Sequence, residues 1–286
     1  MNKRTVGILH PGQMGVSIAA AVKNNGHNVV WCSHGRSDDT RARATENGLG
    51  EVVTLEEFCS ACDAVICICP PDAAEAVAQN VVECGFLGLY VDANAISPQR
   101  AVRIAGTIQG TGAIFVDGSI IGPPAWKPNT TWLYLSGEDA ATAADLFDDG
   151  PVMAVVMGEE PGQASALKMC YSANTKGTTA LLTAVLGAAE ALGVRGVLED
   201  QWHKEGSGLD ERAPRGARNV TAKAWRFAGE MDEISETFSD VGLPGGFHAA
   251  AADIYRRLAG FKDAEEIPPL DDVLSALLVH APEVDA

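Results

Sequence analysis

The amino-acid sequence predicts an α/β fold, in which an N-terminal Rossmann domain with a mostly parallel sheet precedes an all-helical C-terminal domain. Three observations lead to this prediction. Short apolar runs alternate with helical patterns over the first half of the chain, a glycine-rich turn follows the first run, and the pattern becomes purely helical after Met157. Apolar strands that alternate with helices are typical of a parallel sheet covered on both faces. Residues 1–158 are therefore expected to form the Rossmann domain and residues 159–286 the helical domain.

Seven short, β-rich runs are the expected strands. They cover residues 5–9, 28–32, 64–69, 89–93, 113–119, 131–136 and 152–157. Residues 162–194 contain no proline and are rich in Ala and Leu, which predicts one helix of about 45 Å that joins the two domains. Glycine and proline breaks beyond this segment separate several shorter helices.

The composition excludes several classes of partner. The 286-residue chain has 38 acidic residues against 21 Lys and Arg, a formal net charge of -17. A charge of this sign opposes binding to nucleic acid or to an anionic membrane. The N-terminus lacks the apolar run and cleavage site of a secretory signal, and no segment has the ~20 apolar residues that span a bilayer. We therefore expect a cytoplasmic protein that acts on a small molecule.

The seven cysteines do not indicate a disulfide framework or a zinc site. Cys59 and Cys62 form a CxxC pair, and Cys67 and Cys69 stand two residues apart, but no second CxxC or HxxxH completes a ligand set. Cys67 and Cys69 alternate with apolar residues in a strand-like run, so they are interpreted as packed thiols. No metal site is predicted.

The segment "GILHPGQMG", residues 7–15, is close to the dinucleotide-binding pattern G-x-G-x-x-G. It follows a predicted strand and opens a predicted helix, which is the context that the pattern requires. Gly12 stands where the backbone approaches the pyrophosphate, and Gly15 where helix and strand pack closely. His10 replaces the first glycine, which is acceptable if its φ stays negative. The segment therefore predicts a phosphate site at the helix N-terminus; the alternative is a glycine turn that serves packing alone.

The end of the second predicted strand decides between the two nicotinamide cofactors. An NAD site places an acidic residue there for the ribose 2′-hydroxyl, but "WCSHGRS", residues 31–37, contains none. Arg36 and Ser37 offer a guanidinium and a hydroxyl that suit a 2′-phosphate, and His34 can add a contact. The alternative is a solvated loop arginine. The sequence favours NADP(H).

Several motifs together resemble a known superfamily. "GILHPGQMG", "SHGRS", "CICPPDAAEAV", "DANAISP", "VDGSIIGPP" and "GQASALKMCYSANTKGTTAL" are similar to those of the β-hydroxyacid dehydrogenases, which include 6-phosphogluconate and 3-hydroxyisobutyrate dehydrogenases. The late segment "AWRFAGEMDEISETFSDVGLPGGFHAAAADIYRRL" resembles the branch with the C-terminal domain of unknown function 1932. The resemblance implies a Rossmann domain that binds NADP(H) and a helical domain that contributes to the substrate site and to a homodimer.

The resemblance also implies roles for individual residues. Lys168 matches the lysine that acts as general acid/base, because an ammonium group can stabilise and protonate the oxygen that gains negative charge during hydride transfer. The implied cofactor-binding residues are His10, Gly12, Gln13, Met14, Ser33, His34, Arg36, Ser37, Cys69, Pro70 and Asn94. The implied substrate-binding residues are Ser119, Ile120, Ile121, Gly122, Tyr171, Ser172 and Thr175, of which the last three share a helix face with Lys168.

Three departures from the superfamily pattern affect the expected substrate. Ile121 stands where a carboxylate-binding serine is usual, Ser172 replaces a substrate-binding asparagine, and Asp232-Glu233 replaces a later lysine–aspartate pair. These changes remove groups that would hold a small carboxylate. The expected pocket is more apolar, with contributions from Ile120, Ile121, Pro123, Trp126 and Trp202 or Trp225, and the alternative for each tryptophan is simple packing.

Three functions remain open at this stage. The first is an NADP(H)-dependent dehydrogenase or reductase that acts on a β-hydroxy acid, an aldehyde or a related carbonyl. The second is an NADPH-dependent imine reductase, which would reduce a C=N bond; Lys168 favours the carbonyl reaction, because imine reductases commonly lack this lysine. The third is a nucleotide-sensing scaffold without enzymatic activity. We also expect a homodimer formed mainly by residues after about 190, because the helical half is rich in Ala, Leu and Val.

Overall fold

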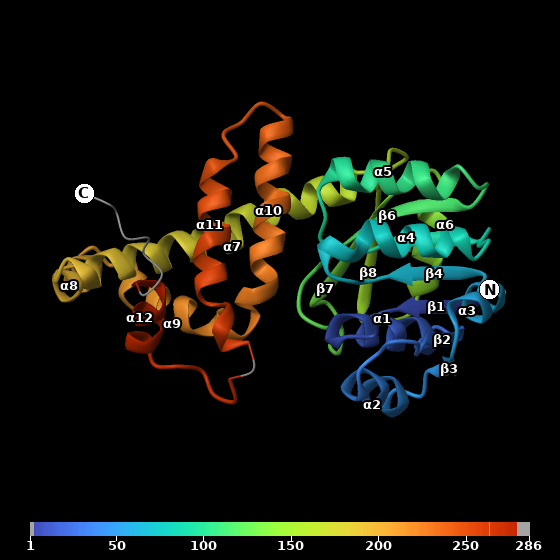
Figure 1. Ribbon diagram of the computed structural model, residues 1–286, viewed down its shortest axis with the longest axis horizontal. Coiled ribbons are helices and arrows are strands. Elements are labelled where there is room, and N and C mark those ends of the chain that lie inside the picture. Colours follow the sequence, from blue (N-terminus) through green and yellow to red (C-terminus); the bar gives the residue numbers. More distant parts are fainter. Residues whose placement is uncertain (1–2, 263, 279–286) are drawn as a thin grey trace. The chain divides into compact units, whose positions relative to one another are not determined.

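The chain divides into two compact units, Met1–Met169 and Cys170–Ala286. The computed structural model describes residues 3–262 and 264–278. The first unit contains a sheet with helices on both faces, and the second is helical (Figure 1). The boundary between the units lies inside helix α7, Gln163–Ala191. The division at residue 158 into a cofactor domain and a substrate domain stays a prediction.

An eight-stranded sheet forms the centre of the first unit, with strand order β3-β2-β1-β4-β5-β6-β7-β8. All neighbouring strands pair in parallel except β6 and β7, which pair antiparallel. The first six strands have the Rossmann order. Successive strands are added toward one edge of the sheet up to β3 and toward the other edge from β4 onward, so the order reverses between β1 and β4. The strands are β1 Thr5–Leu9, β2 Asn28–Cys32, β3 Gly50–Val52, β4 Ala64–Cys67, β5 Leu89–Asp92, β6 Ile114–Ile121, β7 Thr131–Ser136 and β8 Val152–Gly158.

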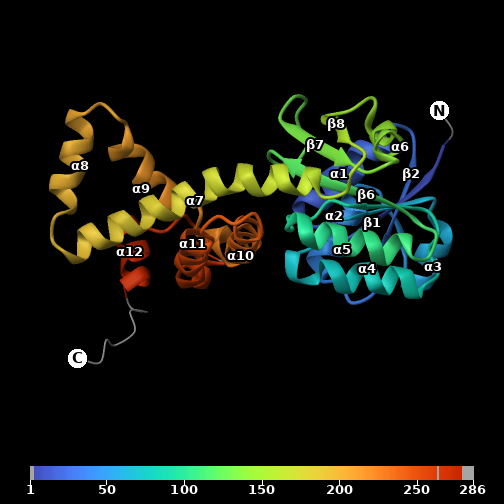
Figure 2. The same ribbon diagram turned by 90° about the horizontal axis from the view of Figure 1, so that it is seen from above.

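Helices cover both faces of this sheet because successive strand side chains alternate between the faces. Within β4, Ile66 packs into the core beneath α1 and α6, whereas Val65 and Cys67 pack into the core beneath α3, α4 and α5. Figure 2 shows α4 and α5 on the side of the sheet opposite to α6. The helices of this unit are α1 Gln13–Asn24, α2 Asp38–Glu46, α3 Leu55–Ala61, α4 Ala74–Glu83, α5 Pro98–Gln109 and α6 Ala140–Ala144.

The predicted fold class is confirmed, and the differences concern the ends of elements. β1, β2 and β7 begin and end at the predicted residues, whereas β4 stops at Cys67 instead of Cys69. Strand β3 was not predicted, because its sequence "GEV" contains one apolar residue and lies at the sheet edge. The predicted long helix is present as α7.

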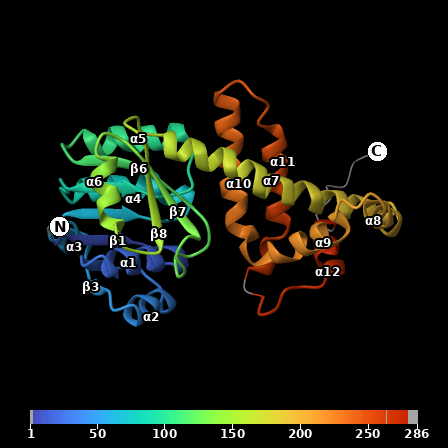
Figure 3. The same ribbon diagram turned by 180° about the vertical axis from the view of Figure 1, so that it is seen from behind.

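In its described residues, the second unit contains the later part of α7, five further α-helices and two short 3-10 helices. Helices α10 and α11 form an antiparallel pair (Figure 3), in which the Phe238 ring packs edge-on against His248 with centroids 4.3 Å apart, and Phe227 packs against Tyr255. Within the described residues, no helix is long and apolar enough to cross a membrane. These helices are α8 Arg195–Lys204, α9 Leu209–Asn219, α10 Ala224–Asp240, α11 Gly246–Arg257 and α12 Leu270–Leu278.

Candidate active site

The turn between β1 and α1 leaves room for an anion. Gly12 is the N-cap of α1 without a side-chain cap, and the first helical turn contains no acidic residue. A Cβ at Gly12 would meet no atom within 4 Å, so the backbone is open to a ligand on that side. The N–H groups of a first helical turn have no intrahelical acceptor and carry partial positive charge. This turn therefore fits a pyrophosphate, with Gln13 and Met14 as the first residues of the helix.

His10 corrects one expectation of the sequence analysis. Its φ is +66°, in the left-handed region, whereas the sequence-based interpretation required a negative φ. The His10 carbonyl oxygen accepts a hydrogen bond from Gly12 N at 2.7 Å. A Cβ at Gly15 would lie 2.5 Å from the same carbonyl oxygen. Gly15 is thus required for close packing, as predicted, and His10 keeps the glycine-like backbone of the position that it occupies.

A buried polar group lies where β4 and β5 end. Asn94, almost fully buried, accepts a hydrogen bond from Cys69 N at 2.5 Å and directs its amide nitrogen to Cys67 Sγ at 3.6 Å. Asp92 Oδ1 accepts from Asn94 N at 3.0 Å, and burial raises the pKa of Asp92. The contact between the two thiols lowers the pKa of Cys67 and raises that of Cys69. Asn94 thereby fixes the loop that was predicted to contact the cofactor, whose next residue, Pro70, is exposed.

The end of β2 presents the residues predicted to distinguish NADP(H) from NAD(H). His34, Arg36 and Ser37 are exposed, and Ser37 Oγ caps helix α2 by accepting from Thr40 N at 3.4 Å. The same hydroxyl also lies 3.1 Å from Thr40 Oγ1, and either of the two hydroxyl groups can be the donor in this contact. The first turn of α2 also contains the exposed Asp38 and Asp39, whose charges oppose a phosphate.

Strand β3 adds an acidic residue to this region that the sequence analysis missed. Glu51 forms an ion pair with Arg41. A hydrogen bond from the buried Ser33, followed by the one from Arg41, lowers the pKa of Glu51. Residues 31–37 contain no acidic residue, but the neighbouring strand β3 supplies Glu51, whose negative charge is balanced by Arg41. The parallel pairing of β2 with β3 places it there, since Trp31 is in register with Glu51.

Asp117 on β6 anchors the start of helix α7. Its Oδ2 atom accepts from the backbone nitrogens of Gly162 and Ser165, each at 2.9 Å, and from Ser136 Oγ at 3.2 Å. Its Oδ1 atom accepts from Ser165 Oγ at 2.6 Å. Burial raises the pKa of Asp117, and these hydrogen bonds act in the opposite direction. Sequence analysis assigned it no role, although an aspartate inside an apolar strand was a signal that it has partners.

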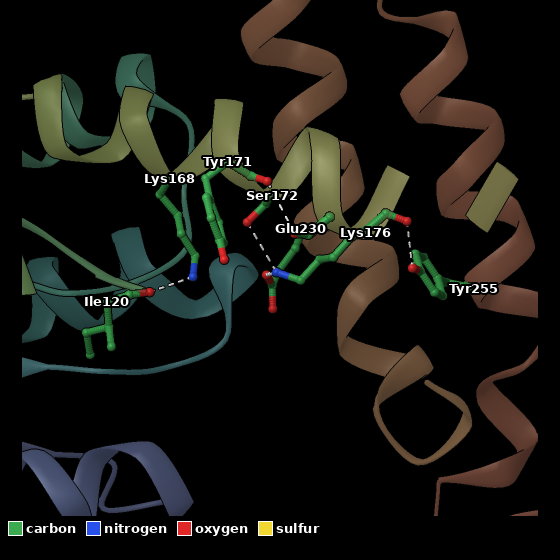
Figure 4. Close-up of polar contacts among 8 residues, drawn as sticks. Ile120, Lys168, Tyr171, Ser172, Lys176, Glu230 and Tyr255 are labelled. Atoms are coloured by element: carbon green, nitrogen blue, oxygen red, sulfur yellow. Dashed lines mark hydrogen bonds and ion pairs between the residues drawn. The ribbon is translucent and has the colours of Figure 1, made fainter. Parts of the chain in front are cut away.

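Lys168 lies one turn beyond this anchor. Its Nζ donates a hydrogen bond to Ile120 O at 2.6 Å, at the end of β6 (Figure 4). Ile120 and Ile121 are buried, and Ser119 is fully buried within the strand, so the Ser119 hydroxyl does not reach solvent. Gly122, next in the chain, has a φ of +132°, and a Cβ there would lie 2.3 Å from Thr130 O. The structure thus brings the predicted catalytic lysine to the predicted substrate loop.

The other predicted substrate residues lie further along α7, in the second unit. Tyr171 and Thr175 are exposed, whereas Ser172 is buried. Ser172 Oγ accepts from Lys176 Nζ at 3.4 Å, and Lys176 forms an ion pair with the buried Glu230 of α10 (Figure 4). Ser172 therefore belongs to a polar cluster that joins α7 to α10, and its role toward a substrate stays a prediction.

The tryptophans proposed for the pocket differ in their surroundings. Trp126 is exposed, and Trp202 is buried within α8. Trp225 is partly exposed, and the ammonium group of Lys262 lies 4.6 Å from the centre of its ring. Trp202 and Trp225 therefore have contacts within the helical unit. Trp126 is exposed in the loop after β6, and its predicted role in the pocket stays a prediction.

Comparison with known families agrees with the resemblance seen in the sequence. Residues 5–147 match the NAD binding domain of 6-phosphogluconate dehydrogenase, and residues 189–258 match the domain of unknown function DUF1932. A solved structure described as a conserved protein similar to 3-hydroxyacid dehydrogenases is 30% identical, with a TM-score of 0.64, and covers 91% of this chain and 100% of that one. These matches confirm the predicted superfamily and branch.

Other similar proteins include one further relative and two enzymes that share the fold. A 28.5 kDa protein from Methanothermus fervidus is 32% identical over 166 residues, which is 58% of this chain and 63% of that protein's length. The fold is shared with 3-hydroxyisobutyrate dehydrogenase from Mycobacterium tuberculosis, at 17% identity, a TM-score of 0.70 and coverage of 97% of this chain and 100% of that one. An imine reductase from Bacillus cereus is also similar, at 18% identity, a TM-score of 0.54 and coverage of 95% and 98%.

Proposed function

The chain belongs to the family of the NAD binding domain of 6-phosphogluconate dehydrogenase, and we propose from this premise that it is an NADP(H)-dependent oxidoreductase. The proposed reaction transfers hydride between the cofactor and the carbonyl carbon of a β-hydroxy acid, an aldehyde or a related small molecule. When bound, the nicotinamide ring supplies or accepts the hydride. The protein's own part is to hold the cofactor, orient the substrate and move one proton.

The position of Lys168 carries the proposal. Its ammonium group is held at the end of β6 by the Ile120 carbonyl, on a helix whose start is fixed by Asp117. An ammonium group has three donors, so Lys168 can contact Ile120 and also a substrate oxygen. In the reductive direction it stabilises the negative charge that develops on this oxygen and donates the proton. In the oxidative direction its neutral form accepts the proton.

The loops after β1 and β2 support the choice of cofactor. The open side of Gly12 and the N-terminus of α1 suit the pyrophosphate. Arg36 and Ser37 are exposed at the end of β2, where a 2′-phosphate would lie in the Rossmann arrangement. Glu51, which could otherwise take up a ribose hydroxyl, is already paired with Arg41. This pairing favours NADP(H) over NAD(H). The negative charges of Asp38 and Asp39 act in the opposite direction, because they repel a 2′-phosphate.

Imine reduction is the second candidate function. It is favoured by the apolar end of β6, where Ile120 and Ile121 offer no side-chain partner for a substrate carboxylate. Lys168 argues against imine reduction. A C=N substrate is itself protonated on nitrogen, so its positive charge is stabilised less by an ammonium group than the negative charge that develops on a carbonyl oxygen.

One assay separates these candidates. The purified protein is incubated with NADPH or NADH and with a panel of aldehydes, 3-oxo acids and cyclic imines, and cofactor oxidation is followed by absorbance. The proposal expects turnover of a carbonyl compound with NADPH. Turnover of imines alone would establish the second function. Binding of NADPH without turnover of any compound would favour the nucleotide-sensing scaffold.

We also propose that the protein acts as a homodimer formed by the helical unit. Three large apolar side chains on α7 and α8 and in the turn between them are exposed: Leu181, Leu192 and Val197. Large apolar side chains that one chain leaves exposed can be buried in a subunit contact. Light scattering at micromolar concentration should give twice the 29.9 kDa of one chain, and a stable monomer would contradict the proposal. The expected cytoplasmic location stays a prediction.

A further inference from the structure

Three potential metal ligands converge where the strand order of the sheet reverses. His10 follows β1, Cys67 ends β4, and Cys69 follows two residues later. The ligand atoms of these three side chains all lie within 4.8 Å of one another. In the described ranges, 3–262 and 264–278, no other group of three His, Cys, Asp or Glu side chains meets this criterion. The sequence analysis missed the group because its third member comes from another strand.

The spacing of the two thiols suits a tetrahedral cation. Cys67 Sγ and Cys69 Sγ are 3.7 Å apart. Two thiolates on one tetrahedral Zn²⁺ are about 3.8 Å apart, since each Zn–S bond is about 2.3 Å long. The backbone between the two residues therefore already holds the sulfur atoms at the separation that such a cation requires. The left-handed backbone of His10 brings a nitrogen ligand to the same point.

Several polar groups lie beside the three ligands, on the edge of an apolar core that includes Cys67. Asn94 binds both cysteines, through Cys69 N and Cys67 Sγ, so it orients the thiols as a neighbouring residue does in metal sites. The side chains of His10 and Tyr90 both interact with Cys67, and the buried Asp92 Oδ2 has no hydrogen-bond partner among the described residues. Buried polar atoms without a partner are costly and call for a bound ion or ordered water. Asp92 and Tyr90 are both fully buried.

We propose that His10, Cys67 and Cys69 bind one thiophilic divalent cation of the Zn²⁺ type. One imidazole nitrogen and two thiolates supply three ligands, and the fourth position is left for water or another small ligand. Two Zn–S bonds and one Zn–N bond form, and the thiol protons pass to the buffer. No change of oxidation state is involved. The CxxC pair Cys59 and Cys62 forms no comparable site, because among the described residues no third potential ligand lies close to both thiols.

The cation site shares its loops with the proposed dinucleotide site. His10 precedes Gly12 at the turn after β1, and Cys69 belongs to the loop after β4. Occupation of either site is therefore expected to weaken binding at the other, and the effect is reciprocal. This consequence rests on the proposed function, whereas the cation site itself does not.

The test measures binding of the metal directly. Fully reduced protein is titrated with Zn²⁺ against a chromophoric chelator, and with Co²⁺, whose thiolate charge-transfer absorption reports the sulfur ligands. One equivalent is expected. The variants His10→Asn, Cys67→Ser and Cys69→Ser should each weaken binding by roughly tenfold or more. Asn is chosen at position 10 because it tolerates a positive φ, so this variant tests the ligand and keeps the turn.

Matched controls locate the bound metal. Cys59→Ser and Cys62→Ser should bind Zn²⁺ as the unmodified chain does. Unchanged binding in the His10 and Cys69 variants, or loss of binding in the Cys59 and Cys62 variants, would overturn the proposal. The same titration is repeated with NADPH present. Zn²⁺ that binds at these residues with an affinity independent of NADPH would support the cation site and count against the proposed location of the dinucleotide.

Discussion

The Ser165 hydroxyl donates a hydrogen bond to Asp117 Oδ1 at 2.6 Å, although the two residues are 48 positions apart in the sequence. The other carboxylate oxygen accepts from backbone nitrogens in the first turn of α7. A carboxylate at this end of a helix is stabilised by the partial positive charge of the free N–H groups. The pair therefore fixes where α7 begins relative to β6, and Lys168 lies one turn later on the same helix. The relationship is positional: Asp117 acts on the proposed chemistry through the helix that it holds.

Replacing this carboxylate should destabilise the protein. In Asp117→Asn only one side-chain oxygen remains as an acceptor, so the amide nitrogen faces either the backbone N–H groups or the Ser165 hydroxyl, and the hydrogen bonds that remain lose their charged acceptor. We expect the free energy of unfolding to fall by about 2–3 kcal/mol, measured by urea denaturation followed by circular dichroism. Ser165→Ala removes one donor and leaves the carboxylate, so it should cost about 1 kcal/mol. Equal stability of Asp117→Asn and the unmodified chain would mean that α7 begins where it does without this anchor.

The proposed preference for NADP(H) is expected to depend on Arg36. Arg36→Ala should raise the Michaelis constant for NADPH by about one to two orders of magnitude, because a charge-assisted contact to the 2′-phosphate is lost. The constant for NADH should change little, since NADH carries no such phosphate. Initial rates measured with both cofactors give the comparison. A similar loss with both would show that Arg36 supports the loop in general.

Arg41 provides a matched control for this experiment. It pairs with Glu51 and lies over the Trp31 ring, in the same region but with its charge already balanced. Arg41→Ala should therefore alter the preference between the cofactors less than Arg36→Ala does. A larger effect of Arg41→Ala would instead place the 2′-phosphate beside α2.

The fold could be predicted from the sequence because its signals are local. The apolar runs of β1, β2 and β7 and the proline-free segment of α7 define their elements without reference to the rest of the chain. The features that were missed depend on partners distant in the sequence. Glu51 is next to Ser33 only because β3 pairs with β2. His10 meets Cys67 only because β1 pairs with β4.

The backbone at His10 shows a second limit of the sequence analysis. A non-glycine residue is expected to avoid positive φ, and that expectation failed here. The signals lie in the three-dimensional turn: the His10 carbonyl oxygen accepts from Gly12 N, and a Cβ at Gly15 would lie 2.5 Å from the same oxygen. Propensity states what a residue prefers in isolation, whereas the turn is determined by the packing of α1 on β1.

Acid should weaken the fold through His27. Burial, followed by the nearby positive charge of Arg4, lowers the pKa of His27 below its ordinary value of 6.5. Its Nδ1 accepts a hydrogen bond from Arg4 N at 3.2 Å, and protonation would remove that acceptor. Because the folded pKa is lower than the unfolded one, the contribution of His27 to stability is present above about pH 6.5 and is lost as the pH falls through the folded pKa.

Denaturation at several pH values between 5 and 8 measures this contribution. The midpoint in urea should decrease below about pH 6.5, and His27→Asn, which cannot take up a proton in this range, should make the decrease smaller. His248 is the second histidine whose pKa is lowered by burial, so some dependence should remain in the variant. A pH profile unchanged by His27→Asn would assign the effect to His248 and other groups.

Lys176 affects the choice of control for testing the proposed catalytic role of Lys168. It lies eight residues beyond Lys168 on α7, about 12 Å along the helix axis, and so cannot reach the same reacting oxygen. It pairs with the buried Glu230, and removal of one partner of a buried ion pair is strongly destabilising. Lys176→Met alone would mix a loss of stability with any loss of activity. The double variant Lys176→Met/Glu230→Gln removes both charges and is the matched control.

Lys168→Met should abolish most of the turnover and keep cofactor binding. Methionine preserves much of the side-chain bulk and removes both the charge and the donor. Turnover should fall by about two to four orders of magnitude, the range for a lost general acid, while NADPH affinity, measured by fluorescence titration, stays within a few-fold because its proposed contacts lie at Gly12, Arg36 and Ser37. The control variant should retain most of its turnover. If Lys168→Met stayed nearly as active as the unmodified chain, the proton donor would be another group, with Tyr171 the first to test, and imine reduction would become the better proposal.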